Sequence, residues 1–475
     1  MSKLNITDYA IYRWRYRIGY GLIAAILVSV LLFTGLFLTG GISVQEMQSV
    51  VISNSLNFSN LNTLAIADLP FHVLQNISIS LLGVSFVSIK LPSIILAFVT
   101  IVGAIVLIRI WFKPSISVLV ALVAISTGQF LFMSQDGTPN GMCLVWSAFL
   151  LLVASIISKT HRFRKTLIIL FAILAVLSLY TPLSIYMLIA LASAIMVHPH
   201  LRYLAKQIPN VDIVLGTIIS MALTTPLIIS IVKDPSLGLT LLGIPTRFPD
   251  FGANITLLGA QYLGFNKPSG VTAMTPFFEL GSMLIIALGI YVVAKNHSSA
   301  KSYVIAIWSL ILIPVIIINP NLAAVTLFPM VLLLAKGLNK LLLYWYNLFP
   351  LNPYARIGGL IPIIILISVL VLSGTDRYIY GYRYDPKITP NFSHDLKLIP
   401  KNTKNIVVAN DELAFYKVVE SRNKDFKVTT TPISNDFLAT HKAKKQFNGY
   451  NIKKIITTHN TNNSDRFYLY TKTTQ

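Results

Sequence analysis

Apolar residues fill most of the chain from residue 18 to residue 374, in runs of about the length that crosses a bilayer. A membrane-spanning helix needs about 20 consecutive apolar residues. Eleven spans are expected, at 18–40, 92–112, 116–134, 140–158, 166–181, 183–197, 212–232, 275–294, 302–319, 322–343 and 358–374. The fifth and sixth are short and meet at Thr181-Pro182, so a re-entrant pair is an alternative for them.

The first long loop between these spans, 41–91, carries two short amphipathic segments. In 44–53 the apolar positions share one helical face and Glu46 lies opposite. In 70–82 the polar residues, His72 among them, gather on one side. Both segments predict helices that lie in the plane of the lipid headgroups.

The chain becomes polar after residue 374, which divides it into an expected transmembrane domain, 1–374, and a second domain, 375–475. Strand patterns are expected at 404–410, 426–431, 454–458 and 467–471, and helical patterns at 411–420 and near 436–445. Alternating patterns of this kind predict a small α/β domain. It has no Gly-rich phosphate loop and no HExxH motif, so we expect an accessory role for it.

Composition places the chain among polytopic membrane proteins. Charged residues make up 12% of it and hydrophobic residues 55%, with a mean hydropathy of +0.70. An ordinary soluble domain carries about 25% charged residues. The net charge of +21 is explained by Lys and Arg that flank the spans, and no basic patch is interleaved with stacking aromatics, so nucleic acid is not expected as a partner.

The single cysteine, Cys143, excludes a disulfide or a cysteine-based metal site within one chain. Residues 18–40 are too long for the apolar part of a cleavable signal peptide and are interpreted as the first span.

The basic residues predict the orientation in the membrane. If the N-terminus is cytoplasmic, 17 basic residues before residue 375 fall inside and four fall outside, namely Lys90, Lys233, Arg247 and Lys267. Basic residues concentrate in cytoplasmic loops. With an odd number of spans, the C-terminal domain is then extracytoplasmic. The expected location is the cell membrane.

Seven carboxylates lie between residue 18 and residue 374, and three of them fall in or beside the first two expected outer loops. These three are Glu46, Asp68 and Asp136. A charge in or near a bilayer is costly and tends to be retained for a function. The arrangement indicates an enzyme whose polar cavity opens on the outer face.

Three segments carry a family resemblance: G-G-I-S-V-Q-E-M (40–47), A-D-L-P-F-H (67–72) and L-L-G-V-S-F-V-S-I-K-L-P-S (81–93). They resemble the family-39-like GT-C glycosyltransferases, which include protein O-mannosyltransferases and the aminoarabinose transferases that modify lipid A. Those enzymes carry a D-E pair after the first span, an E-K-P-P-L-like element, and L-x-G-x-x-x-x-x-R-L-P-S at the second span. The resemblance covers 15–160 by motif and the remainder by span layout. It implies a bacterial membrane enzyme that uses a polyprenyl-phosphate sugar on the outer face.

The correspondence is incomplete. Gln45-Glu46 stands where the family has D-E, so either Glu46 replaces the missing acid or the activity is altered or absent. Asp68 stands at the first position of the E-K-P-P element, and Lys90 stands at the Arg before L-P-S. Asp136, within S-Q-D-G-T-P-N-G, matches the second outer loop.

Sugar transfer from a lipid phosphate requires a base for the acceptor hydroxyl and positive charge, or a metal, for the leaving phosphate. Glu46 is the expected base, and Asp68 and Asp136 are expected to position the acceptor or a metal. No cofactor is assigned, and a divalent metal held by Glu46 and Asp136 remains open. The expected substrate-binding residues are His72, Lys90, Arg247 and Lys267.

Four of these residues also have a structural interpretation. Glu46 could be solvated on an interfacial helix, Asp68 could cap the helix that follows, and Asp136 could belong to a D-G turn. Lys90 could snorkel at a helix end. Glu279, just inside the eighth span, could face the cavity.

The sequence thus predicts a GT-C-like enzyme that moves a sugar from a polyprenyl-phosphate donor to a protein, glycan or lipid, with inversion as the resemblance implies. One alternative is a transporter or flippase of lipid-linked sugars. Such a protein would be expected to have paired broken helices in internal repeats, and no convincing repeat is found. The other is a non-catalytic relative that binds lipid.

The predicted topology can be tested by cysteine labelling after Cys143 has been replaced. A cysteine at residue 60 or 420 should react with an impermeant thiol reagent added outside, because both positions are expected to be extracytoplasmic. A cysteine at residue 162 or 350 should be protected. Protection at residue 420 would overturn the eleven-span arrangement.

Overall fold

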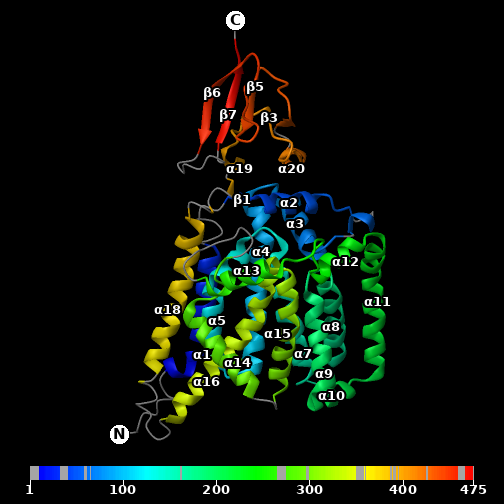
Figure 1. Ribbon diagram of the computed structural model, residues 1–475, viewed down its shortest axis with the longest axis vertical. Coiled ribbons are helices and arrows are strands. Elements are labelled where there is room, and N and C mark those ends of the chain that lie inside the picture. The colour runs from blue at the N-terminus through cyan, green and yellow to red at the C-terminus, as the bar shows by residue number, and fades with distance from the viewer. Residues whose placement is uncertain are drawn as a thin grey trace.

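The protein forms a bundle of long helices, two short helices across one end of it, and a small sheet domain beyond them (Figure 1). The computed structural model describes residues 10–32, 41–57, 61–64, 66–160, 163–264, 274–295, 299–348, 358, 360–385, 388, 392–393, 395–423, 426–457 and 466–473. The C-terminal end lies beyond the sheet domain, and the N-terminal end lies at the opposite end of the molecule (Figure 1).

The bundle follows the expected spans in order. Its helices are α1 (Ala10–Leu32), α4 (Phe86–Trp111), α5 (Pro114–Ser126), α6 (Gly128–Gln135), α7 (Met142–Ile157), α8 (Arg164–Ser178), α9 (Ser184–Val197), α10 (Pro199–Lys206), α11 (Asn210–Lys233), α14 (Leu280–Lys295), α15 (Ala300–Ile318), α16 (Leu327–Leu348) and α18 (Leu360–Tyr378). Short 3-10 segments precede α7 (η4, Pro139–Gly141) and α16 (η5, Pro320–Thr326), and a π-helical turn (η6, Ile379–Arg383) follows α18.

Six helices in the described part of the chain are long and apolar enough to cross a membrane, or up to eight if each of two bent pairs is one span. The bent pairs are α5–α6, with an angle of 64°, and α9–α10, with an angle of 98°. The protein is therefore a multi-pass membrane protein, while the count of eleven spans stays a prediction. Part of the first expected span, 33–40, lies outside the described residues.

Thr181-Pro182 lies between the end of α8 at Ser178 and the start of α9 at Ser184, so the helices break there as expected, and the re-entrant alternative stays a prediction. A further break falls at His198, where α9 ends and Pro199 begins α10. Proline lacks the backbone donor that would continue the preceding helix, and it disfavours helical backbone at the residue before it.

Two short helices, α2 (Val44–Asn54) and α3 (Leu69–Leu82), lie across the end of the bundle as the pattern predicted (Figure 1). The polar side of α2 faces inward, since Glu46 and Ser53 are buried whereas Val44 is 54% exposed. The solvated interpretation of Glu46 is therefore wrong. The long loop after α11 contains two more helices, α12 (Pro235–Leu242) and α13 (Phe251–Leu263).

The C-terminal domain contains a five-stranded mixed sheet in the order β4-β3-β5-β7-β6. Its elements are β3 (Asn405–Val407), α20 (Leu413–Asn423), β4 (Lys427–Thr429), β5 (Asp436–Thr440), β6 (Tyr450–Thr457) and β7 (Arg466–Lys472). β3 is parallel to β4 and β5, and β7 is antiparallel to β5 and β6.

The helix expected near 436–445 is wrong, because β5 occupies the first part of that segment and a turn follows. β5 is the central strand of the sheet, and its residues 437–440 are all buried. A strand that is covered on both faces shows a continuous apolar run rather than an alternating one. A short run of that kind cannot be distinguished from helix by periodicity.

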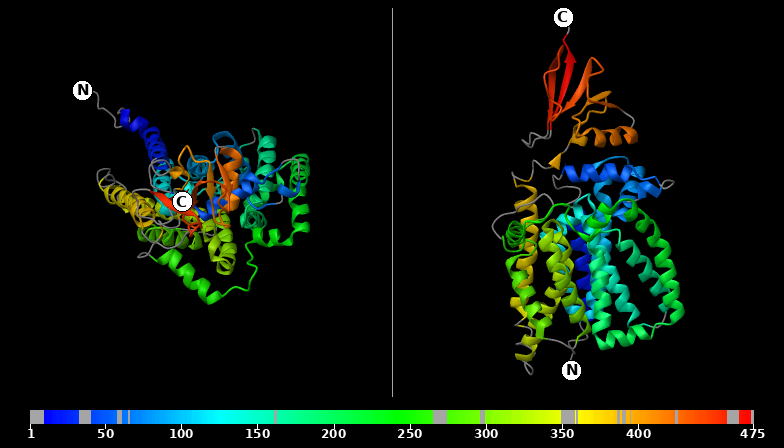
Figure 2. Two further views of the ribbon diagram at one scale, coloured as in Figure 1. Left: turned by 90° about the horizontal axis from the view of Figure 1, so that it is seen from above. Right: turned by 45° about the vertical axis from the view of Figure 1, so that its right-hand side comes forward.

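The C-terminal domain docks directly on the segment that carries Glu46. The two-residue strand β1 (Ile42–Ser43) pairs antiparallel with β2 (Phe392–Ser393). A Cβ at Gly41 would lie 2.3 Å from the carbonyl oxygen of Ser393, so only glycine permits this approach. On the other side of α2, the Arg422 guanidinium donates to Asn54 Oδ1 at 3.0 and 3.1 Å. Figure 2 shows α20 above α2 from a second direction.

Candidate active site

Glu46 lies in the first turn of α2, where it belongs to a capping box. Its backbone N–H donates to Ser43 Oγ at 3.2 Å, and its own Oε2 accepts from the Ser43 N–H at 2.7 Å. A capping box satisfies two otherwise unpaired N–H groups at a helix start. Here it also fixes the direction in which the second carboxylate oxygen points.

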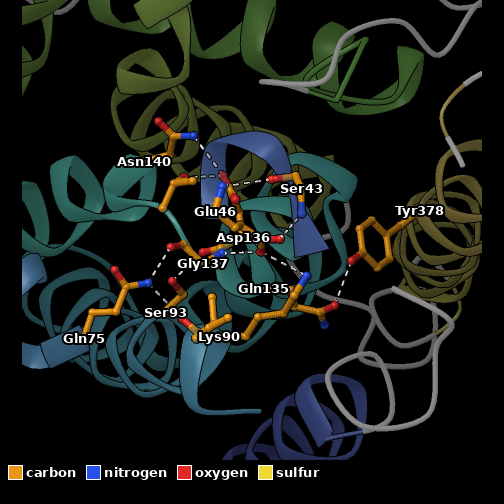
Figure 3. Close-up of polar contacts among 12 residues, drawn as sticks. Ser43, Glu46, Gln75, Lys90, Ser93, Gln135, Asp136, Gly137, Asn140 and Tyr378 are labelled. Atoms are coloured by element: carbon orange, nitrogen blue, oxygen red, sulfur yellow. Dashed lines mark hydrogen bonds and ion pairs between the residues drawn. The ribbon is translucent and has the colours of Figure 1, made fainter. Parts of the chain in front are cut away.

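That second oxygen, Oε1, accepts two further contacts inside the protein (Figure 3). The Lys90 ammonium lies 3.0 Å from it, and the Gly137 N–H donates to it at 2.7 Å. The side chains of Lys90 and Glu46 are only 2% and 1% exposed. Buried charges persist only when they are paired and hydrogen-bonded, and Glu46 meets both conditions.

Gly137 is the point at which three segments meet. A Cβ at this residue would lie 2.7 Å from Ile89 Cγ2 and 3.2 Å from Glu46 Oε1. Its carbonyl accepts from Gln75 Nε2 at 2.8 Å, and the same amide donates to the Ile89 carbonyl at 3.2 Å. Gln75 on α3 therefore holds the loop after α6 against the start of α4.

Asp136 precedes Gly137 and is 8% exposed. Its Oδ2 accepts from the Thr138 hydroxyl and, at 2.9 Å, from Asn140 Nδ2, whereas its Oδ1 accepts no hydrogen bond from the described residues. Burial, and then the charge of Glu46, raise the pKa of Asp136 to about 6, against the hydrogen bonds from Thr138 and Asn140 and the charge of Lys90. Asp136 is thus mainly ionised at neutral pH but retains a strong affinity for a proton.

Asp68 belongs to a separate network. It adopts a left-handed backbone with φ 54°, and its N–H donates to the Tyr180 carbonyl at 2.7 Å. The Thr181 hydroxyl, which accepts from Trp146 Nε1 at 2.9 Å, acts on the Asp68 carboxyl to lower its pKa. Backbone strain of this kind often marks functional positions.

The Asp68 side chain does not cap α3, although the residue occupies the N-cap position. Its Oδ1 is buried without a hydrogen-bond partner among the described residues. Burial raises the pKa of Asp68 to about 7. The capping interpretation is therefore wrong, and Asp68 is a buried carboxyl near its titration point at neutral pH.

His72 links α3 to α2 through Ser53, whose Oγ lies 2.8 Å from His72 Nδ1. The Ser53 hydroxyl donates to Gln75 Oε1 at 2.6 Å. Burial lowers the pKa of His72 to about 4, so the ring is neutral at pH 7. In this state His72 offers no positive charge to a phosphate, and its role in substrate binding stays a prediction.

The expected site residues do not all come together. Glu46, Lys90 and Asp136 form one cluster, and Asp68 lies apart from it. Arg247 is exposed in the loop between α12 and α13, and Lys267 lies outside the described residues. Glu279, at the start of α14, lies 3.7 Å from the guanidinium of Arg377.

Several contributors were missed by the sequence interpretation. The Tyr378 hydroxyl donates to Gln135 Oε1 at 2.8 Å, which joins the end of α18 to the end of α6 (Figure 3). Tyr378 and Tyr382 are fully buried and stack at 6.2 Å. They lie beyond the expected end of the last span. Their spacing of one helical turn was the signal in the sequence that could have indicated a shared helical face.

The arrangement of Glu46 and Asp136 does not fit a divalent metal. Among the described residues, no three His, Cys, Asp or Glu side chains gather in a metal-binding group. Both oxygens of Glu46 already accept from donors, and one of these donors is a cation. Hard divalent cations need several open oxygen ligands.

The fold is that of a polytopic membrane protein. Its buried acids form a polar site at one end of the helical bundle. A family model described as dolichyl-phosphate-mannose-protein mannosyltransferase matches residues 70–229. No curated protein matches the chain.

Solved structures resemble it over nearly its whole length. ArnT from Cupriavidus metallidurans in the apo state is similar over 89% of this chain and 93% of that chain, with a TM-score of 0.53 and 11% identity. The same protein bound to undecaprenyl phosphate is similar over 95% of this chain and 97% of that chain, with a TM-score of 0.56 and 10% identity. The Archaeoglobus fulgidus oligosaccharyltransferase, tethered with an acceptor peptide containing the NVT sequon, is similar over 88% of this chain and 64% of that chain. The TM-score is 0.52 and the identity is 12%.

The chain therefore has the GT-C fold. The resemblance to GT-C glycosyltransferases of the mannosyltransferase and ArnT type, stated above from the motifs, is confirmed.

The buried pair predicts strong energetic coupling between Glu46 and Lys90. Glu46→Gln and Lys90→Met should each lower the free energy of unfolding in detergent by about 3–5 kcal/mol, because each leaves one buried charge unpaired. The double variant should lose less than the sum of the two. Asp411→Asn, which removes the exposed pair with Lys442, is the control and should change little. Additive losses would contradict the coupling.

The raised pKa of Asp68 predicts a pH-dependent stability. Between the ordinary value of 3.8 and the folded value of about 7, the folded state binds a proton that the unfolded state has released. The contribution of Asp68 to stability is therefore full below pH 3.8 and is lost as the pH rises through about 7. Asp68→Asn tolerates the left-handed backbone but cannot titrate. Unfolding curves of the two proteins should diverge in favour of the variant as the pH rises, and parallel curves would contradict the raised pKa.

Proposed function

We propose that this protein transfers a sugar from a polyprenyl-phosphate donor to a hydroxyl group of a protein, glycan or lipid. The reaction takes place at the end of the bundle that carries the C-terminal domain, on the outer face of the membrane. The ArnT structure with undecaprenyl phosphate and the oligosaccharyltransferase structure with an acceptor peptide support these substrate classes. The observation that carries the proposal is the cluster of Glu46, Lys90 and Asp136 at that end of a GT-C fold.

The geometry favours Asp136 as the general base. One of its carboxylate oxygens accepts no hydrogen bond from the described residues, and its pKa of about 6 suits a base that works near neutral pH. The acceptor hydroxyl gives its proton to Asp136, and its oxygen forms a bond to C1 of the sugar. The bond from C1 to the phosphate oxygen breaks, and polyprenyl phosphate leaves with the electron pair. A single displacement of this kind inverts the configuration at C1.

Glu46 and Lys90 then act through the loop. Glu46 was predicted from sequence to be the base, but in the folded chain both of its oxygens accept from donors. Glu46 is better suited to hold Gly137, and with it the adjacent Asp136. Lys90 lies near enough to Asp136 to lower its pKa, so it favours the ionised base. Asp68, in its own network, is left to position the acceptor.

A non-catalytic lipid-binding protein is the second candidate. Gln45 takes the place of the first acid of the family pair and is only partly buried, while Glu46 is closed by its ion pair. A chain that had lost transfer would tolerate these features. The flippase alternative gains no comparable support.

The base assignment predicts the effect of Asp136→Asn on transfer. The variant should fold and bind a polyprenyl-phosphate sugar but turn over at least about a hundredfold more slowly, because loss of a general base costs about 10²–10⁴ in rate. The wild-type rate should fall as the pH drops through about 6, where Asp136 becomes protonated. Asp250→Asn, which alters the exposed cap of α13, is the matched control and should keep the wild-type rate.

The same rate measurements on Glu46→Gln distinguish the role of Glu46 from that of Asp136. Removal of the Glu46 charge removes one cause of the raised pKa of Asp136, so the acidic limb of the rate profile should move to lower pH. If Glu46→Gln that remains folded and binds donor has lost transfer while Asp136→Asn retains it, the base is Glu46. If wild type transfers sugar and neither variant slows it, the carboxylate mechanism fails. If wild type binds donor but transfers no sugar, the binding protein gains.

A further inference from the structure

Three lysines gather at the end of the bundle opposite the C-terminal domain. Lys159 follows α7, Lys301 lies in the first turn of α15, and Lys336 lies in α16. The Nζ atoms of Lys301 and Lys336 are each 5.9 Å from the centroid of the Phe112 ring. Their helices reach this end of the bundle together with α10 and the N-terminal part of the chain (Figure 1).

Every hydrogen bond that these ammonium groups donate goes to a neutral oxygen. Lys159 donates to the Ile110 carbonyl at 3.1 Å, and Lys301 donates to the Trp111 carbonyl, at the end of α4. Lys336 donates to Ser302 Oγ at 3.1 Å. An ammonium has three N–H donors, so each lysine retains two beyond these contacts within the described residues.

No carboxylate balances the three charges in the part of the chain that the structure describes. None of the three lysines forms an ion pair there, although the charges of Lys159 and Lys336 both act on Lys301. Asp212 lies in the first turn of α11, at the edge of the bundle, and Asp8 lies outside the described residues. The cluster therefore combines mutual repulsion with partial loss of hydration.

Orientation in the membrane explains basic residues at this end, but it does not explain their convergence. Lysines that only mark a cytoplasmic loop extend into water. Lys336 instead is 8% exposed within α16, and its charge acts on Lys301, while Lys159 at the rim of the cluster is exposed. The cap residue Ser299 makes no side-chain cap bond, and within the described residues its carbonyl accepts only from the N–H groups of Ser302 and Tyr303, so the start of α15 adds the N–H group of Lys301. Backbone N–H groups and lysines together are suited to phosphate.

We propose that Lys159, Lys301 and Lys336 bind a phosphate group, presented either by an anionic lipid of the adjacent leaflet or by a soluble phosphate. The site lies at the opposite end of the bundle from Glu46 and does not depend on sugar transfer. Phe112 and Trp111 border it, and the indole N–H of Trp111 donates to Ser155 Oγ at 2.8 Å. Aromatic residues of this kind are enriched at the level of the lipid headgroups.

Native mass spectrometry of the purified full chain tests the lipid arm, by titration with phosphatidylglycerol and, separately, phosphatidylcholine. Wild type should retain phosphatidylglycerol more strongly than phosphatidylcholine. Each change of Lys159, Lys301 or Lys336 to Gln should weaken phosphatidylglycerol binding about fivefold, the contribution of one lysine near an anionic surface. Lys301→Arg keeps the charge and should bind as wild type does. Lys340→Gln, an exposed position one turn further along α16, is the matched control.

Inorganic phosphate, added during thermal unfolding, tests the soluble arm. Stabilisation of wild type and of Lys340→Gln, but not of Lys301→Gln, would support the site with a soluble ligand. Weakened phosphatidylglycerol binding in Lys301→Gln and recovery in Lys301→Arg would support it with a lipid ligand. If Lys301→Gln and Lys336→Gln match Lys340→Gln in both measurements, the proposal is overturned.

Discussion

Two opposite charges with almost no contact with solvent, Glu46 and Lys90, determine how the functional end of this protein is built. A carboxylate in such a place must be satisfied on both oxygens, so the chain brings an N–H from Ser43 and another from Gly137 to it. These contacts join α2, the start of α4 and the loop after α6. Any movement that exposed Glu46 to a substrate would have to separate this pair in a poorly hydrated environment, where attraction between charges is strongest.

The two ends of the bundle treat charge in opposite ways. At the end under the C-terminal domain, acids are buried beside a lysine and beside hydroxyl and amide donors, and their affinity for protons is adjusted by burial. At the far end, lysines donate to carbonyl and hydroxyl oxygens, with no described acid paired to them. The first environment is suited to moving protons, and the second is suited to holding an anion.

Much of the fold could be predicted from sequence because apolar runs and short amphipathic segments are local signals. The order of the helices, the two short helices α2 and α3, and most strands of the C-terminal sheet follow from them. The segment at 436–445 failed because both faces of β5 are covered: Leu438 packs on one side of the sheet, and Phe437 and Ala439 pack on the other, which is information that only the folded domain contains. The bends within α5–α6 and α9–α10 likewise made span counting ambiguous.

The site was predictable only in part. Acids within apolar sequence are conspicuous, so Glu46, Asp68 and Asp136 could be named. The different environments of these acids could not be predicted, because the ion pair of Glu46 and the left-handed backbone of Asp68 arise from tertiary contacts. Gly137 contributes through its backbone N–H and its missing Cβ, and neither has a sequence signature in a D-G turn.

The pairing of β1 with β2 has a consequence for how the protein is made. Ser43, which caps the helix of Glu46, lies opposite Phe392, so most of the chain separates the two partners. During synthesis from the N-terminus, the bundle is complete before the strand that β1 needs has emerged. Until then β1, which precedes α2, has no strand partner. A contact between segments this distant in sequence forms slowly. The functional end of the bundle is therefore fully assembled only after the C-terminal domain has been synthesised and has docked.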